Sequence, residues 1–116
     1  MLTLMIFFMR ERNSEMENMK VKKLQSGETI ISREAGNSMT PILKSRQPVR
    51  IEPADIDDIQ IGDIVYCKVK GNYYTHKVYG KGEKGVLIGN NHKHMNGWTK
   101  NIYGKVIEIL PMTYKK

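Results

Sequence analysis

The spacing of the glycines constrains this chain more than any other feature of its sequence. All ten glycines occur from Gly27 onward, where they separate short runs rich in Ile, Val, Tyr and Thr. β-Branched and aromatic residues fit strands, and glycines fit the tight turns between them. The pattern predicts a mostly β domain with little helix. We expect strands at Glu28–Arg33, Val49–Glu52, Asp63–Lys70, Tyr73–Tyr79, Gly85–Gly89 and Ile102–Leu110.

The third and fourth of these strands should form a hairpin. Gly71 and Asn72 favour turns and lie between the two runs, so we expect the runs to pair antiparallel. Because side chains alternate between the faces of a strand, His76 shares its face with Tyr74 and Val78. We therefore expect His76 on the buried side of the hairpin.

Helix is predicted in two short places. Ser14 and Glu17 have the spacing of a capping box, which predicts a helix over Ser14–Lys23. A turn is expected after Ser38, where Pro41 restricts the backbone.

The first 27 residues are expected to form an N-terminal arm, partly disordered, ahead of one β domain over residues 28–116. The arm opens with the apolar run MLTLMIFFM and then meets Arg10. A spanning helix needs about 20 apolar residues, and a secretory signal has its basic residues before its apolar run, so we expect neither. Five of the eight methionines lie in the first 19 residues. Either the assigned start lies upstream of the true one, or the arm is a short apolar anchor or partner-binding segment.

The composition excludes several classes of protein. With 116 residues there is room for one modest domain, and a single cysteine, Cys67, excludes an internal disulfide. The cysteine count favours a reducing compartment, and we expect a cytoplasmic protein without a transmembrane anchor. The net charge of +7 attracts acidic partners. The lysines are scattered and no helix-turn-helix pattern is present, so nucleic acid is not the favoured partner.

Residues 36–43, which read GNSMTPIL, contain the most informative serine. Ser38 follows Gly36 and Asn37, precedes Met39, and has a proline three positions on. This arrangement is typical of a sharp turn that exposes the hydroxyl and leaves backbone N–H groups free to bind an oxyanion.

Four further blocks follow this serine in order. They are GDIV at 62–65, THKV at 75–78, GNN at 89–91 and YGKV at 103–106. With GNSMTPIL they resemble the superfamily of type I signal peptidases, LexA-type repressors and UmuD-type proteins, over residues 30–110. The resemblance implies a small, barrel-like core of mixed or antiparallel strands and a serine endopeptidase. Compact single-domain forms of this kind look like those carried by phages and mobile elements.

The resemblance also assigns roles to individual residues. Ser38 falls at the nucleophile position, and His76 falls at the position of the general base. Gly36, Asn37 and Met39 would line the site and assist the Ser38 N–H in binding the oxyanion. The chemistry fits these residue types, because imidazole titrates near neutral pH and can take the proton of a weakly acidic serine.

The match is imperfect at the group that orients the histidine. Signal peptidases with a histidine base carry acidic residues in and after the GNN-like loop, and this chain has asparagines there instead. An asparagine can still fix the tautomer of an imidazole without stabilising its charge. The candidates for this task are Asn90, Asn91, Asn96 and the more distant Asp63.

Two other functions remain open. A catalytically inactive relative would use the same cleft to bind an extended peptide. A basic β-barrel would bind single-stranded nucleic acid by stacking bases on Tyr73, Tyr74 and Trp98. We expect a protein or peptide substrate, no cofactor and no metal, because His92 and His94 have no further ligands nearby.

Overall fold

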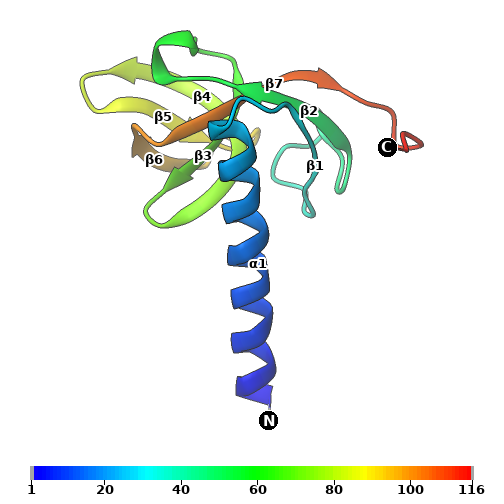
Figure 1. Cartoon of the computed structure of the whole chain (residues 1–116). Coiled ribbons are helices and arrows are strands. Elements are labelled where there is room, and N and C mark those ends of the chain that lie inside the picture. The colour runs from blue at the N-terminus through cyan, green and yellow to red at the C-terminus, as the bar shows by residue number, and fades with distance from the viewer. Residues whose placement is uncertain (1, 116) are drawn as a thin grey trace.

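Seven antiparallel strands form one sheet, and a single long helix leads into it. The structure is a computed structural model that describes the backbone of residues 2–115 and the side chains of residues 14–115. The strand order is β1-β2-β7-β3-β4-β5-β6 (Figure 1). The elements are α1 (Leu2–Gln25), β1 (Ile30–Arg33), β2 (Pro48–Pro53), the 3₁₀ turn η1 (Ile56–Asp58), β3 (Ile64–Val69), β4 (Asn72–Gly82), β5 (Gly85–Gly89), β6 (Met95–Thr99) and β7 (Ile102–Ile109).

The mostly β class is confirmed, and the sheet is curled without closing into a barrel. The sheet curls so far that β6 ends beside β3, where Thr99 Oγ1 donates to the Lys68 carbonyl at 2.6 Å. The outer strands β1 and β6 nevertheless do not pair in the part of the chain that the structure describes, so the sheet has two edges.

All six expected strands are present, and so is the hairpin between β3 and β4. The strand that the sequence did not predict is β6, whose residues are MNGWT. Asn and Gly have low strand propensity, and pairing with β5 holds this segment in the sheet in spite of them.

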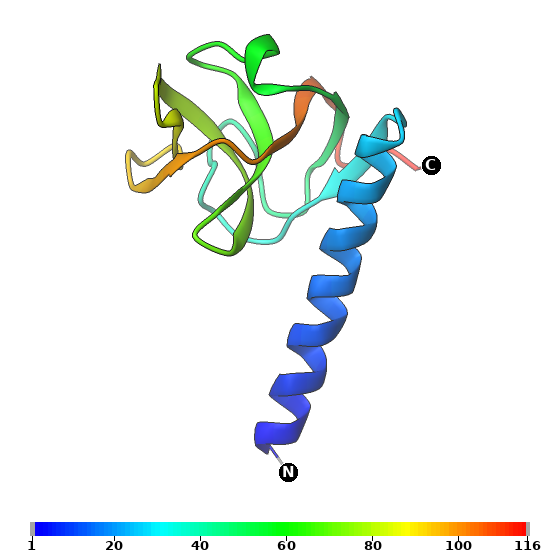
Figure 2. The same cartoon turned by 60° about the vertical axis from the view of Figure 1, so that its left-hand side comes forward.

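The helix α1 is longer than expected. It begins at Leu2, so the prediction that the capping box at Ser14 starts it is wrong. It ends in a Schellman motif, in which Gly27 has a φ of +94° and the Glu28 N–H donates to the Lys23 carbonyl at 2.9 Å. Two views show α1 projecting from the sheet (Figures 1 and 2). The expectations for the opening nine residues concern side chains outside the described part of the chain. Where the chain is described, no helix is both long and apolar enough to cross a membrane.

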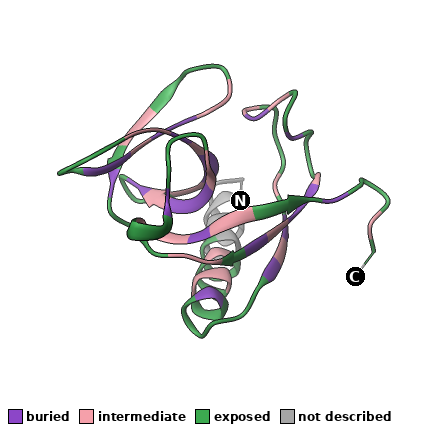
Figure 3. Ribbon diagram, turned by 90° about the horizontal axis from the view of Figure 1, so that it is seen from above, coloured by how far each residue is buried: buried purple, intermediate pink, exposed green. Residues whose placement is uncertain are grey.

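The central strand β3 is buried on both faces and divides the core in two. Seen from above, the buried residues lie mainly in the strands and the exposed residues mainly in the loops and chain ends (Figure 3). Tyr66 points into a cluster with Leu24, Met39 and Ile51. Its neighbours Val65 and Cys67 point the other way, into a cluster that lies against β4 and β5. Burial raises the pKa of the Cys67 thiol to about 12, so this cysteine is a packing residue.

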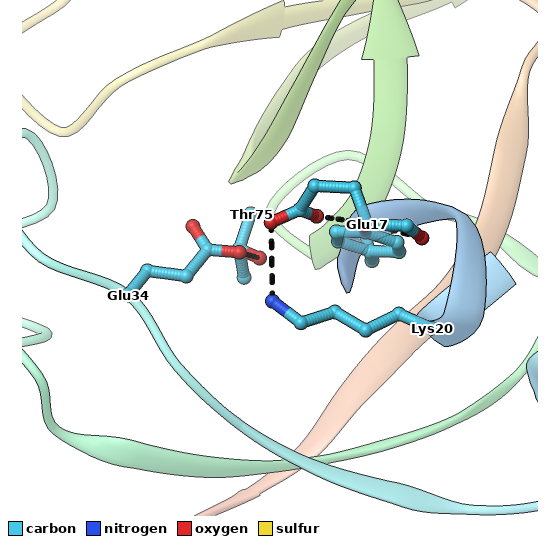
Figure 4. A network of polar contacts seen from close by, with 5 residues as sticks. Glu17, Lys20, Glu34 and Thr75 are labelled. Atoms are coloured by element: carbon cyan, nitrogen blue, oxygen red, sulfur yellow. Dashed lines mark hydrogen bonds and ion pairs between the residues drawn. The ribbon is translucent and has the colours of Figure 1, made fainter. Parts of the chain in front are cut away.

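The last turns of α1 attach the helix to the sheet. Leu24 is 2% exposed within the first cluster, and Val21 packs against the same residues. Nearer the N-terminus of the helix, Glu17 accepts a hydrogen bond from the Tyr66 hydroxyl and forms an ion pair with Lys20 at 3.3 Å (Figure 4). The helix therefore contacts the sheet through an apolar end and a half-buried polar group.

We expect Leu24→Ala to lower the free energy of unfolding by about 2 to 5 kcal/mol, because it leaves a cavity where α1 meets the sheet. Met19→Ala, on the same helix at 57% exposure, should change it by less than about 0.5 kcal/mol. Urea denaturation measures both values. Equal effects of the two substitutions would contradict the packing described for α1.

Candidate active site

The loop that carries Ser38 connects β1 to β2 and is anchored at both sides of the serine. Met39 is 5% exposed and belongs to the first core cluster, and the Leu43 N–H donates to its carbonyl at 2.8 Å. Before the serine, the Asn37 carbonyl accepts the Thr40 N–H at 3.2 Å. The expected turn after Ser38 is therefore present, and it holds the serine half-exposed.

His76 lies on β4, where that strand has a free edge. Residues 72–76 pair with β3 on one side, and pairing with β5 begins only at Lys77. The Ser38 loop lies at this edge, with the Ser38 Oγ 3.1 Å from His76 Nε2. His76 is 7% exposed, and its ring stacks on Tyr74 with 4.8 Å between centroids. The buried position expected for His76 is thus confirmed.

Asn96 supplies the partner of the second ring nitrogen. Its Oδ1 lies 2.7 Å from His76 Nδ1. Because a carbonyl oxygen only accepts hydrogen bonds, Nδ1 carries the proton in this arrangement. The lone pair of Nε2 is then directed to the Ser38 hydroxyl, which is the tautomer needed to accept a proton from it.

A β-bulge turns Asn96 toward the histidine. Along β6, Gly97 pairs with Ile88 and Met95 pairs with Gly89, so Asn96 is an extra residue without a partner on β5. With regular alternation Asn96 would share the face of Trp98, whose ring lies over Gly80 on the outer side of the sheet. Bulges redirect a side chain in this way, and here the extra residue brings the amide to His76.

The loop between β5 and β6 holds the Ser38 loop in place. The Asn91 N–H donates to the Ser38 carbonyl at 2.9 Å, and its Nδ2 donates to the Thr40 carbonyl at 2.9 Å. His92 Nε2 lies 3.0 Å from the Asn37 carbonyl. Asn90 shapes the loop itself, because its Oδ1 accepts the N–H groups of His92 and His94.

The structure thus gives different roles to the four residues that were candidates for orienting His76. Asn96 contacts the ring, and Asn90 and Asn91 act on the loops around it. Asp63 lies elsewhere, where it accepts the Gln60 N–H and lies 3.6 Å from the Lys105 ammonium. The structure therefore does not bring Asp63 to the histidine.

The backbone around Ser38 offers one free donor beside its hydroxyl. Within residues 14–115 the Ser38 N–H makes no hydrogen bond, whereas the Gly36 N–H donates to Ser45 Oγ at 2.9 Å. Gly36 has a φ of +111°, a conformation that side chains disfavour, so it shapes the turn. Gly36 and Met39 line a cavity beside the serine, and Asn37 contributes its carbonyl to the turn.

Residues 5–107 match a family model described as Peptidase S24-like. The chain belongs to this family. The match confirms the resemblance to the LexA and signal peptidase superfamily and gives the chain a serine peptidase domain, whose substrate is protein. A search of the curated proteins finds no match.

Burial sets the protonation of the histidine in this S24-like domain. It lowers the pKa of His76, an effect that the hydrogen bond to Asn96 partly opposes and the nearby His94 reinforces. The imidazole is therefore neutral at physiological pH, and a neutral ring is the form that accepts a proton.

Glu34 and Thr75 are site residues that sequence reasoning missed. Both line the cavity beside Ser38, and the Thr75 hydroxyl donates to the Glu34 carboxylate (Figure 4). Burial raises the pKa of Glu34, and the hydrogen bond from Thr75 and the charge of Lys20 partly oppose this rise. Thr75 precedes His76 in the THKV block, which was a usable signal; nothing in the sequence around Glu34 marks it.

The aromatic side chains considered for base stacking are separately packed. Tyr73 stacks on Tyr66 at 5.9 Å, and its hydroxyl donates to Asn18 of α1. Tyr74 stacks on His76, and Trp98 covers Gly80. For metals, no cluster of three or more His, Cys, Asp or Glu side chains occurs in the described region.

We expect His76 to titrate below the ordinary histidine value of about 6.5, because burial penalises its charged form. Asn96→Ala removes an acceptor that favours the charged ring, so it should lower this pKa further. Imidazole Hε1 chemical shifts across a pH series measure both values. Titration of His76 at or above 6.5 in the wild-type protein would contradict the burial described here.

Proposed function

We propose that this protein is a serine endopeptidase in which Ser38 is the nucleophile and His76 the general base. One observation carries the proposal, the continuous chain of contacts from Ser38 Oγ through the His76 ring to Asn96 Oδ1. A nucleophile within reach of a base, which is itself held by a third group, is the arrangement that activates a serine.

The reaction would proceed by acyl transfer. Ser38 Oγ attacks the scissile carbonyl carbon while His76 Nε2 takes the hydroxyl proton, and the Ser38 N–H stabilises the resulting oxyanion. His76 then gives this proton to the leaving amine as the C–N bond breaks, which leaves an ester on Ser38. Water attacks the ester, His76 accepts one of its protons and returns it to Ser38 Oγ, and the new carboxyl end departs.

The free edge of β4 supports an extended polypeptide as the substrate. Between residues 72 and 76 the outer backbone groups of β4 have no neighbouring strand among those described. A peptide in extended conformation could add at this edge and bring a peptide bond to the adjacent Ser38. A folded substrate would need a loop or terminus that adopts this conformation.

We expect new protein N-termini in cells that express the wild-type chain, and their loss in Ser38→Ala and His76→Ala, because each substitution removes one participant in proton transfer. Losing a general base typically costs about 10² to 10⁴ in rate. Mass spectrometry of labelled N-termini measures the products.

An exposed serine outside the site supplies a matched control, Ser14→Ala, which should leave the profile intact. Circular dichroism establishes that each variant is folded. Identical profiles from wild type, Ser38→Ala and His76→Ala would replace the peptidase with a catalytically inactive protein that binds an extended peptide in the same cleft.

The rate of cleavage should fall at acid pH with a midpoint below about 6.5, because protonated His76 accepts no proton and its pKa is lowered. Asn96→Asp places a negative charge beside the ring, which favours the imidazolium and should move the midpoint to higher pH. Initial rates across a pH series on one cleaved peptide measure the shift. A midpoint that is the same in both proteins would assign the titration to another group.

A further inference from the structure

A small cavity beside Ser38 has the size of a short side chain. Its volume is about 30 Å³ and Ser38 itself lines it. A cavity that holds one water needs roughly 10 to 15 Å³, so this cavity has room for a small group of a few heavy atoms. A substrate whose carbonyl carbon reaches Ser38 Oγ places a neighbouring side chain next to this cavity.

The wall of the cavity is apolar on one side and polar on the other. Met39, Leu43 and Val49 supply the apolar side, and all three belong to the first core cluster. Glu34 and Thr75 supply polar groups, and Lys44 and Gln47 also line the cavity. An occupant that matches both sides is a short side chain with one polar group.

The polar side presents an acceptor. The Thr75 hydroxyl donates to the Glu34 carboxylate, which also interacts with the Thr75 backbone N–H. A carboxylate has about four lone-pair sites, so Glu34 can accept a further hydrogen bond. The Glu34 carboxyl is also held in place, since Thr75 lies on β4 and Glu34 directly follows β1 (Figure 4). A donor that enters the cavity would meet an oxygen whose position is already fixed.

We propose that this cavity binds the substrate residue on the amino-terminal side of the cut and selects serine or threonine, whose hydroxyl donates to Glu34. The inference rests on the proposed peptidase function and adds the class of its substrate. Alanine fits the volume and leaves the acceptor without a partner. Lysine and arginine exceed the volume, and aspartate meets a second carboxyl.

The test compares matched peptides that differ only at the residue before the cut. A peptide library digested with the wild-type protein provides a cleaved sequence, which is then synthesised with Ser, Thr, Ala and Val at that position. We expect kcat/KM for Ser and Thr to exceed that for Ala by roughly tenfold or more, the effect of one hydrogen bond to a carboxyl group.

Two substitutions of Glu34 separate hydrogen bonding from packing. Glu34→Leu removes the acceptor and should abolish the preference for Ser over Ala. Glu34→Gln keeps a carbonyl oxygen of the same reach and should retain a preference. The ratio of rates within one variant is unaffected by any fraction of unfolded protein, so a loss of stability does not obscure the result.

Binding provides a second readout that needs no catalysis. The Ser38→Ala protein should bind product peptides that end in Ser at least about tenfold more tightly than those that end in Ala, as measured by calorimetry. Cleavage or binding without a preference for Ser or Thr, or a preference that survives in Glu34→Leu, would overturn this inference. Absence of cleavage together with Glu34-dependent binding of Ser-ended peptides would overturn the peptidase and retain the cavity's specificity.

Discussion

The pairing of β3 with β4 is the constraint on which the site depends. Opposite residues of two paired strands lie on the same face of the sheet. His76 therefore lies on the face of Val65, and Thr75 lies on the face of Tyr66. Consecutive residues of β4 therefore belong to opposite halves of the core. The Ser38 loop lies at the edge of β4, between these two halves of the core. Its serine hydroxyl contacts His76, and its Met39 side chain belongs to the half that contains Tyr66.

The neutral partner of His76 gives the site a particular electrostatic character. An aspartate in the position of Asn96 would stabilise the imidazolium, whereas the amide fixes the ring without supplying charge. Burial disfavours the charged ring and lowers the pKa of His76, and the hydrogen bond to Asn96 opposes this effect only in part. The resting site thus favours the neutral, proton-accepting form of His76. In the proposed reaction, the imidazolium would have no adjacent counter-charge within the described residues.

The motif blocks contained Ser38 and His76, which the structure brings together, but little of what surrounds them. Ser38 and His76 could be named because the ordered blocks GNSMTPIL and THKV resemble those of a known superfamily, and strand alternation placed His76 on the buried face. Asn96 remained one of four candidates, since its direction depends on a bulge that pairing with β5 creates. The strand β6 was missed because tertiary pairing outweighs the poor strand propensity of Asn and Gly. The capping box at Ser14 was misleading, because the same residues fit the interior of a longer helix.

The bulge also limits how the length of the chain can change between β5 and β6. Surface loops commonly tolerate insertions and deletions. Here, removal of one residue from the bulge would restore regular alternation in β6. The flanking residues of β6 could still pair with β5. The fold would survive such a deletion, while the amide that contacts His76 would be lost or turned outward. Among related sequences, the number of residues in this segment is therefore as informative about the site as their identity.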